Sequence, residues 1–288
     1  MKIKNRLLVL GASSWLGYLL INNKVIQKYF KEISGTIFKN TVNFNHPVNI
    51  LKTNTGHLDL RQIADWKPSH VINFLRGETE ADFIYHDKLA SYCEQAGANY
   101  FYLSSALALD GYKDAPLMES LEACAVSPYG KFKGRCEQRL YDSNSLNWTI
   151  LRFASVQGYV PHKQTRNEVF LSKMKKGEKV IVDRGVVQNR MLADRLIGGL
   201  SKLIRDNITG IIHFGTMDSS EEYDFLRQQG ERFGWDPENV VSGSLRNVNL
   251  NTIPGKILEL YGTEFRLSEN DTIDDLLADE GLKKYKNN

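Results

Sequence analysis

Short apolar runs alternate with amphipathic segments along the first half of the chain. The pattern predicts strands at residues 6–10, 35–39, 48–52, 67–74, 100–105 and 148–153, and helices at 16–29, 61–67, 80–96 and 129–141. Strands that helices cover on both faces have continuous apolar runs, whereas strands with one face in water alternate. The order of strands and helices therefore predicts an α/β fold, a Rossmann doubly wound parallel sheet.

The pattern becomes irregular after Gly158. Residues 159–167 are polar and rich in turn formers, as expected where a chain leaves a sheet. Beyond them we expect a helix at 167–176, strands at 179–182 and 211–214, a capped helix beginning at 219–222, and a last helix from 271 that ends in a disordered Lys-rich tail. These elements predict a Rossmann domain over residues 1–157 and a smaller C-terminal α/β lobe over residues 158–288.

Composition predicts a soluble globular protein. The 288 residues are 42% hydrophobic, and 37 basic residues balance 34 acidic ones without a basic stripe, so nucleic acid and anionic membranes are not expected partners. No apolar run approaches the ~20 residues that span a bilayer. The three cysteines, Cys93, Cys124 and Cys136, lack metal-ligand spacing, so we expect no metal site, no disulfide framework and a reducing cytoplasmic location.

The first strand runs directly into the segment Gly11-Ala-Ser-Ser-Trp-Leu-Gly17. Gly11 permits a tight turn and Gly17 permits close packing of the following helix on the strand, as in turns that bind a dinucleotide pyrophosphate. Ser14 stands where the middle glycine of that fingerprint belongs, although its hydroxyl and that of Ser13 are additional donors. The segment is either an ordinary strand–helix turn or a phosphate site formed by Gly11, Ser13, Ser14, Trp15, Leu16 and Gly17.

Tyr129 and Lys133 lie four residues apart at the start of a predicted helix, so both side chains share one face. An adjacent ammonium stabilises a phenolate, which lowers the tyrosine pKa from about 10 and makes the phenol a usable proton donor or acceptor. An isolated pair of this kind is more often a solvated helix face. Here it follows the glycine turn and a strand that ends in Ser104 and Ser105, where open α/β sheets place their crevice.

Several motifs in a fixed order point to one family. They are Ser104-Ser105 at a strand end, Asp110-Gly111, Tyr129-Gly130 with Lys133 and Glu137, and Leu151-Arg152-Phe153. With them the chain resembles an extended short-chain dehydrogenase/reductase, closest to the dTDP-4-dehydrorhamnose reductase branch of nucleotide-sugar reductases. The resemblance covers most of the chain and thins after about Glu231.

The resemblance implies an NADP-dependent reductase of a 4-keto nucleotide-activated deoxysugar, in the cytoplasmic supply of sugars for surface polysaccharide. Hydride would pass from the nicotinamide to the keto carbon while Tyr129 donates the proton. Ser105 would hold the carbonyl oxygen, and Lys133 would bind the nicotinamide ribose and lower the Tyr129 pKa. A nucleotide-sugar epimerase of the same family and a non-catalytic NAD(P)-binding regulatory subunit remain alternatives. Dehydration is disfavoured because Ala106-Leu107 provide no added acid and base.

Further cofactor contacts are expected at the ends of the predicted strands. Lys39 follows the second strand where a basic residue suits the 2′-phosphate of NADP and an acidic one suits NAD, so NADP is favoured and NAD is the alternative. A strand end facing solvent would explain Lys39 nearly as well. The resemblance adds cofactor contacts from Asp59, Leu60, Phe74, Leu75 and Phe153.

Three of these positions have a second interpretation. Asp59 is also suited to cap a helix. Phe74 and Leu75 stand where relatives carry small residues that give the cofactor ribose room, so either their backbone alone contacts the cofactor or the pocket is altered.

Substrate contacts are expected from Arg76, Ala106, Asn167 and Arg190. Arg76 could reach a substrate phosphate and Arg190 the sugar diphosphate, although a surface arginine or a structural salt bridge is the more frequent arrangement. Residues from about 186 to 205 resemble the segment that returns to the main domain in extended relatives. The smaller lobe would hold the nucleotide-sugar substrate, and dimers in the family make a homodimer an expectation here.

Overall fold

The computed structural model describes residues 5–114 and 116–287. The described chain divides into two compact units. Unit 1 contains the residues up to Ala108, Ala125–Arg152 and Ile197–Ile212, and unit 2 contains Leu109–Cys124, Phe153–Leu196 and the residues from His213 onward.

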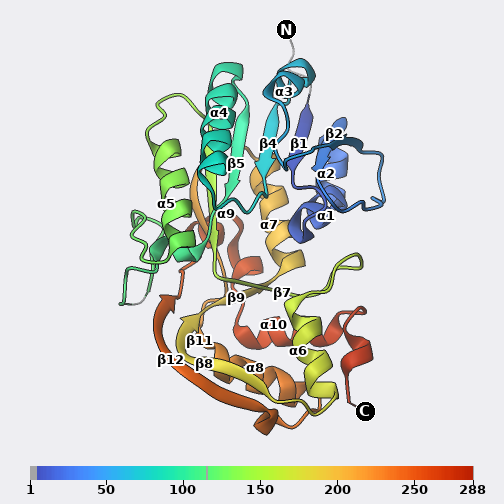
Figure 1. Cartoon of the computed structure of the whole chain (residues 1–288), viewed down its shortest axis with the longest axis vertical. Coiled ribbons are helices and arrows are strands. Elements are labelled where there is room, and N and C mark those ends of the chain that lie inside the picture. Colours follow the sequence, from blue (N-terminus) through green and yellow to red (C-terminus); the bar gives the residue numbers. More distant parts are fainter. Residues whose placement is uncertain (1–4, 115, 288) are drawn as a thin grey trace. The chain divides into compact units, whose positions relative to one another are not determined.

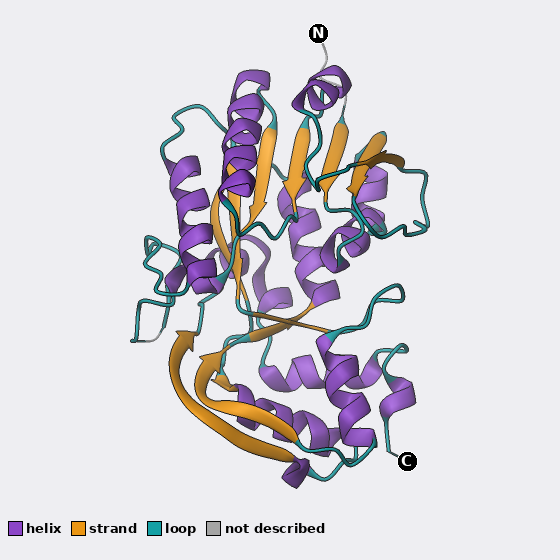
Figure 2. Ribbon diagram, viewed as in Figure 1, coloured by secondary structure: helices purple, strands orange, loops and turns teal. Residues whose placement is uncertain are grey.

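A parallel sheet forms the centre of unit 1 (Figure 2). Within the described residues seven strands pair in the order β3-β2-β1-β4-β5-β6-β10. Their bounds are Asn49–Lys52 for β3, Glu32–Ile37 for β2, Arg6–Leu10 for β1, His70–Asn73 for β4, Asn99–Leu103 for β5, Trp148–Phe153 for β6 and Gly210–Phe214 for β10. Every pairing from β3 to β6 is parallel. Because the order reverses at β1, the sheet is doubly wound, and the predicted fold class is confirmed.

Helices cover both faces of this sheet. The helices of unit 1 are α1 Trp15–Ile21, α2 Lys24–Tyr29, α3 Leu60–Trp66, α4 Glu80–Ala96 and α5 Pro128–Tyr141, together with the part of α7 (Ala193–Arg205) that begins at Ile197. Helices α4 and α5 lie on one face and α7 on the other (Figure 1). Leu8 and Leu10 pack with α3, α4 and α5, while Leu7 and Val9 are also fully buried. Two covered faces explain the continuous apolar runs of the strands.

Two predicted elements of unit 1 have different bounds in the structure. The second strand begins at Glu32 rather than residue 35, because β2 pairs with β1 from Glu32 onward and the Glu32 carboxylate accepts a hydrogen bond from Arg6 Nε at 2.9 Å. The predicted helix at 16–29 is two helices. Asn23 separates them, and its side-chain oxygen accepts from Val25 N at 2.9 Å to cap α2.

Unit 2 contains a three-stranded sheet and a two-stranded one, counted over its described residues. The larger sheet has the order β11-β8-β12, formed by Ser220–Glu221, Val180–Gln188 and Val240–Leu250, and the smaller one pairs β7 Ser155–Gln157 with β9 Arg190–Leu192. The helices are α6 Arg166–Lys175, α8 Glu222–Arg232, α9 Gly255–Tyr261 and α10 Glu269–Ala278. The core includes Phe170, Leu171, Met174, Phe233 and Leu276.

Three expectations for unit 2 differ from the structure. Strand β12 has no predicted counterpart, because its sequence is polar and Leu245 is exposed. Helix α8 begins at Glu222, and its N-cap Glu221 forms no side-chain capping hydrogen bond, although a capped helix was expected at 219–222. The C-terminal segment is ordered through Asn287: Leu282 is fully buried, and Trp235 Nε1 donates to Tyr285 O at 2.8 Å.

The boundaries of the units also differ from the predicted domains. After β6 the chain enters unit 2 at Phe153 rather than at residue 158, because β7 pairs with β9 and therefore belongs with the later strands. The returning segment is Ile197–Ile212 where about 186–205 was expected, and Leu109–Cys124 belongs to unit 2.

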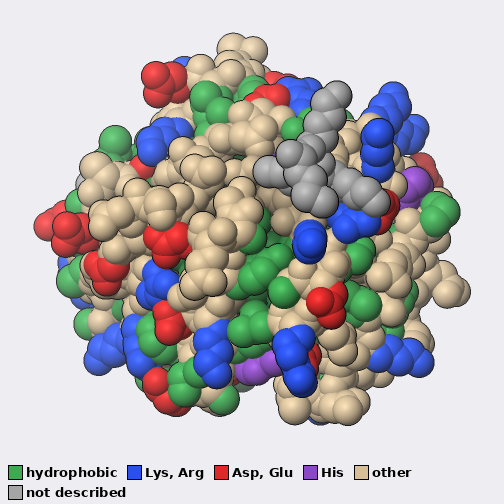
Figure 3. Space-filling model, turned by 90° about the horizontal axis from the view of Figure 1, so that it is seen from above, with side chains coloured by type: hydrophobic (Ala, Val, Ile, Leu, Met, Phe, Trp, Pro, Cys, Tyr) green, Lys and Arg blue, Asp and Glu red, His purple; other side chains and the backbone are tan. Residues whose placement is uncertain are grey.

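On the face shown in Figure 3, Lys and Arg side chains are interspersed with Asp and Glu side chains and with hydrophobic ones. In the described part of the chain, no helix is long and apolar enough to cross a membrane.

Candidate active site

The turn after β1 has the close packing that the glycine pattern predicts. Gly11 has a φ of +79°, which favours glycine. A Cβ on Gly17 would lie 2.4 Å from Gly11 O and 3.1 Å from Ala12 Cα, so only glycine lets α1 approach the turn this closely. The Gly11 and Ala12 amides are held by Thr36 on the neighbouring strand β2, each at 2.8 Å.

Ser14, at the position of the usual middle glycine, is the N-cap of α1. Its Oγ accepts from Gly17 N at 3.1 Å. A hydroxyl that accepts one bond still has its own hydrogen to donate. Ser14 therefore stabilises the turn and remains a donor.

Phe74 and Leu75 form a wall beside this turn. Phe74 is buried, and its N donates to Leu10 O at 3.0 Å. Phe74 Cβ and Leu75 Cδ2 each lie 3.5 Å from the position that a Cβ on Gly11 would occupy. The segment after β4 thus packs directly on the glycine turn.

Helix α5 begins with strong local signals. Ser127 is the N-cap and accepts from Gly130 N at 3.2 Å, and Pro128 occupies the first turn, where its missing N–H has no cost. A Cβ on Gly130 would lie only 2.1 Å from Leu107 O. The start of α5, which includes Tyr129, therefore lies against the segment that follows β5.

Ser104 and Ser105 end β5 in different environments. Ser105 is almost fully buried, and its Oγ accepts from Leu107 N at 3.1 Å, which fixes the short 3-10 helix Ala106–Leu109. Ser104 donates to Glu137, which also forms a fully buried ion pair with Arg152 at 2.6 Å. Ser104 is thus a structural neighbour, and the hydroxyl of Ser105 lies on the segment that contacts α5.

Lys133 connects α5 to β5 and shares a face with Tyr129. Its Nζ donates to Leu103 O at 2.9 Å and lies 5.5 Å from the centre of the Tyr129 ring and 4.7 Å from that of Tyr102. Burial lowers the pKa of the Lys133 ammonium to about 8. The hydrogen bond to the Leu103 carbonyl and the rings of Tyr102 and Tyr129 hold this ammonium in place.

The Tyr129 pKa is not lowered as the spacing predicts. Burial raises it; the charge of Arg76 opposes that rise and the charge of Glu78 adds to it. The guanidinium of Arg76 lies over the Tyr129 ring, 5.3 Å from its centre, and pairs with Glu78. Burial therefore outweighs the nearby positive charge of Arg76. The expected lowering of the Tyr129 pKa by Lys133 stays a prediction.

The other predicted cofactor residues lie at strand ends or beside them. Lys39 is exposed two residues after β2, with its Nζ 5.1 Å from the Phe38 ring centre. Asp59 caps α3 by accepting from Arg61 N at 2.8 Å, and Leu60 is the first residue of that helix. Phe153 is the last residue of β6.

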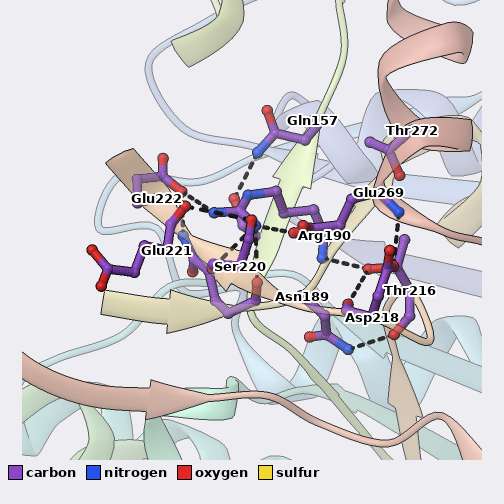
Figure 4. Close-up of polar contacts among 12 residues, drawn as sticks. Gln157, Asn189, Arg190, Thr216, Asp218, Ser220, Glu221, Glu222, Glu269 and Thr272 are labelled. Atoms are coloured by element: carbon purple, nitrogen blue, oxygen red, sulfur yellow. Dashed lines mark hydrogen bonds and ion pairs between the residues drawn. The ribbon is translucent and has the colours of Figure 1, made fainter. Parts of the chain in front are cut away.

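Arg190 occupies the centre of a polar cluster within unit 2 (Figure 4). It is fully buried; one guanidinium nitrogen donates to Glu222 at 2.9 Å, the other pairs with Glu269, and Cζ lies 4.1 Å from the Phe225 ring centre. Arg190 thus forms the structural ion pair that was the alternative expectation, and its contact with a sugar diphosphate stays a prediction.

Asn167, predicted to contact substrate, lies at a pocket of about 340 Å³ within unit 2. Its amide donates to Gln157 Oε1 and accepts from Gly158 N, both at 2.7 Å, so both ends of the side chain are held. Pocket residues that the sequence did not indicate include Ser155, Gln157, Arg166, Lys173 and Glu222. Ala106, the remaining predicted substrate residue, is fully buried in unit 1.

Sequence reasoning also missed a polar cluster behind β4 and β5. His57 Nε2 lies 2.8 Å from Asp82 Oδ1, and its ring stacks on Tyr85 with the centres 4.3 Å apart. His86 is buried beside them and lines the same small cavity of about 20 Å³. The available signal was the helical spacing of Tyr85, His86 and Leu89, which places all three on the buried face of α4. In the described parts of the chain no group of three or more His, Cys, Asp or Glu side chains is arranged to hold a metal ion.

Comparison with known protein families identifies the family of this chain. The family model described as the RmlD substrate binding domain matches residues 77–250, which is more than half of the chain. The chain belongs to the RmlD substrate-binding-domain family. The match contains β5, α5 and β6, and so includes Ser105, Tyr129 and Lys133 of this RmlD-family protein.

Curated and solved relatives agree with this family. The dTDP-4-keto-6-deoxy-D-glucose reductase of Streptomyces niveus is 26% identical over 153 residues, which are 53% of this chain and 52% of that protein. The match thus spans about half the length of that curated relative. The predicted relationship to nucleotide-sugar reductases is confirmed at the level of the family.

Two solved structures show the same fold over nearly the whole chain. The dTDP-4-dehydrorhamnose reductase of Yersinia enterocolitica has a TM-score of 0.76 and 16% identity, covering 96% of this chain and 99% of that one. The dTDP-4-dehydrorhamnose reductase of Bacillus anthracis, solved in complex with NADP, has a TM-score of 0.73 and 16% identity with the same coverage.

Proposed function

We propose that this RmlD-family protein is an NADP-dependent reductase of a 4-keto nucleotide-activated deoxysugar. The observation that carries the proposal is that Ser105, Tyr129 and Lys133 belong to one contact network. Lys133 binds the carbonyl of Leu103 on β5, and Gly130 lies against Leu107, whose N–H is bound by Ser105. These contacts support a site at the carboxyl end of β5, where open α/β sheets form their crevice.

The turn after β1 fits a dinucleotide. A Cβ would close the approach between Gly11 and Gly17, and Ser14 retains a hydroxyl hydrogen for a phosphate oxygen. The indole Nε1 of Trp15 is buried and, among the residues that the structure describes, has no hydrogen-bond partner. Because a buried unpaired donor is costly, a bound phosphate would supply what this indole lacks. Gly11, Ser13, Ser14, Trp15, Leu16 and Gly17 would hold the pyrophosphate.

The chemistry follows from the two hydroxyls. When bound, the nicotinamide supplies a hydride to the carbonyl carbon. Ser105 would donate a hydrogen bond to the carbonyl oxygen, and Tyr129 would transfer its phenolic proton to the alkoxide and regain one from solvent. The net reaction consumes one ketone, one reduced cofactor and one proton, and gives one alcohol and one oxidised cofactor.

The substrate class rests on the relatives. The Streptomyces niveus protein is named a reductase of dTDP-4-keto-6-deoxy-D-glucose, and the two solved relatives are dTDP-4-dehydrorhamnose reductases. For a substrate of that class, the pocket at Asn167 in unit 2 would be the binding site of the nucleotide sugar. The reaction would belong to the cytoplasmic supply of deoxysugars.

Lys39 supports NADP over NAD. It follows β2, the strand next to the glycine turn, where an acidic residue would instead favour NAD. We expect the Lys39→Ala variant to bind NADPH about tenfold more weakly and NADH unchanged, because one exposed charge contact to a phosphate is lost. The measurement is a nicotinamide fluorescence titration, with Lys28→Ala, an exposed lysine on α2, as the matched control.

The outcomes separate the candidate functions. Tight NADPH binding, with reduction of a dTDP-4-keto-6-deoxy sugar that is lost in Tyr129→Phe, supports the reductase. Binding of neither cofactor near millimolar concentration would overturn it and favour a regulatory subunit, since Ser14 and Phe74 alter the cofactor side of the fold. Equal loss of NADPH affinity in Lys39→Ala and Lys28→Ala would refute the role of Lys39.

A further inference from the structure

The aromatic face of Tyr129 is covered by a residue that the predicted catalytic group does not include. The Cζ atom of Arg76 lies 5.3 Å from the centre of the Tyr129 ring. The side chain of Arg76 is 78% exposed, and its Nε donates to Glu78 Oε1. An exposed arginine is usually free to sample many rotamers, so its position here requires an explanation.

The backbone that carries Arg76 is fixed on both sides. Leu75 N donates to Asn73 Oδ1 at 3.0 Å, and Glu78 N donates to Asp82 Oδ2, also at 3.0 Å. Between them Gly77 has a φ of +59°, and a Cβ there would lie 2.8 Å from the Phe132 ring. The segment from β4 to α4 is thus held against α5, the helix that carries Tyr129.

The charged and titratable groups around Tyr129 come from three elements. Arg76 and Glu78 come from the segment after β4, and Lys133 and Cys136 come from α5. From β5, the Tyr102 ring lies beside Lys133, with the ring centre 4.7 Å from Nζ. The Lys133 ammonium is directed to the carbonyl of Leu103 and so is committed to β5.

We propose that Arg76 is a positioning residue for Tyr129, whose guanidinium holds the phenol ring from one face and supplies the fixed positive charge that favours the phenolate. Glu78 orients this guanidinium through their ion pair. The proposal rests on the proposed function, in which Tyr129 is the proton donor. The segment after β4 would then have two roles. Phe74 and Leu75 pack beside the glycine turn, and Arg76 favours the ionised form of Tyr129.

A physical difference between the two cations supports this division. The pKa of the buried Lys133 ammonium is lowered to about 8, so Lys133 loses its charge over the range in which a tyrosine titrates. A guanidinium remains charged throughout that range. The charge of Arg76 is also the leading influence that lowers the Tyr129 pKa against burial.

The test measures the Tyr129 phenol directly. The protein is labelled with 3-fluorotyrosine, whose ring fluorine lowers the phenol pKa and keeps the titration in a range where the protein stays folded. Fluorine NMR then follows the Tyr129 signal, which is assigned by its loss in Tyr129→Phe. Circular dichroism at each pH verifies that the fold is retained.

We expect Arg76→Ala to raise the titration midpoint of Tyr129 by about 0.5, the effect of one charge about 5 Å away in a solvated site. Arg76→Lys should restore part of the shift, because it keeps the charge without the planar guanidinium. Arg135→Ala should leave it unchanged; Arg135 is the matched control because it also lies over a ring, that of Phe83, and pairs with Glu80 on the surface.

The proposal is overturned if Arg76→Ala leaves the midpoint in place or lowers it, or if Arg135→Ala shifts it equally. These outcomes are independent of the reductase assignment. If Arg76→Ala shifts the midpoint while Tyr129→Phe retains full ketone reduction, Arg76 still positions Tyr129 and the proposed catalytic role of Tyr129 fails.

Discussion

At the scale of single residues, burial decides the behaviour of ionisable side chains more than their neighbours in the sequence do. Lys133 and Tyr129 share a helix face, as predicted. Burial nevertheless lowers the pKa of Lys133 and raises the pKa of Tyr129, so it favours the neutral form of both side chains. Sequence spacing identifies which groups can interact. It does not include the desolvation that competes with their attraction.

His86 provides a measurable case of the same effect. Its Nε2 lies 3.0 Å from Cys136 O and its Nδ1 3.0 Å from the Tyr100 hydroxyl, which in turn accepts from Asn73. Neutral imidazole satisfies both contacts by donating to the carbonyl and accepting from the phenol. Burial lowers the pKa of His86 to about 4.

Protonation of His86 should therefore destabilise the protein at low pH. Between about pH 6.5 and pH 4 the unfolded chain binds a proton at this histidine that the folded protein does not, so the free energy of unfolding falls as the pH falls. We expect this contribution to reach about 3 kcal/mol at pH 4 and to be missing in His86→Gln. Urea denaturation at a series of pH values measures it, and parallel curves for the two proteins would contradict the assignment.

At the scale of elements, the site depends on how closely α5 approaches the end of β5. Gly130 is needed because a Cβ there would lie 2.1 Å from the Leu107 carbonyl oxygen. The buried Glu137–Arg152 pair joins the same helix to β6. The small residue Gly130 and the Glu137–Arg152 ion pair thus let α5, which carries Tyr129 and Lys133, lie against the ends of β5 and β6.

Gly130→Ala should disturb this approach. The start of α5 would have to move away from the 3-10 helix after β5, so we expect a loss of about 1–3 kcal/mol in stability and a fall in reductase activity. Gly198→Ala is the matched control: Gly198 is also within a helix, but a Cβ there would meet nothing within 4 Å, so it should stabilise the protein by about 0.5–1 kcal/mol. Thermal unfolding and ketone reduction measure both, and equal effects of the two variants would contradict the packing argument.

At the scale of the whole molecule, each unit has its own core, and the C-terminal segment is part of one of them. Leu282 is fully buried with Met174, Phe233 and Leu276, and Asn287 N donates to Phe233 O at 2.9 Å. The Lys-rich composition of this segment predicted disorder instead. The segment is ordered because its few apolar side chains enter the core of unit 2 while its lysines stay at the surface.

Removal of residues 281–288 should therefore lower the stability of unit 2. Loss of the buried Leu282 side chain alone should cost about 2–5 kcal/mol, as for other large side chains removed from a core. Removal of residues 286–288 is the milder control, because it retains Leu282 and the Tyr285 carbonyl that accepts from Trp235. Limited proteolysis and thermal unfolding compare the two; equal stability of the longer truncation and the full chain would show that the segment adds nothing to the core.

Part of the fold and of the candidate site follows from local patterns along the chain. The doubly wound fold class, the glycine turn, helix α4, and the shared face of Tyr129 and Lys133 all follow from apolar runs, turn residues and helical spacing. These features could be predicted because neighbouring residues alone specify them.

The folded structure sets the contacts between segments that are distant in the sequence. It paired Arg190 with Glu222 and Glu269, placed Arg76 on the ring of Tyr129, and made β12 a strand despite its polar sequence. The partners in each case are separated by many residues or by other elements, so no local pattern records them. Their contacts and their burial exist only once the chain has folded, and burial is what sets the charge state of the candidate site.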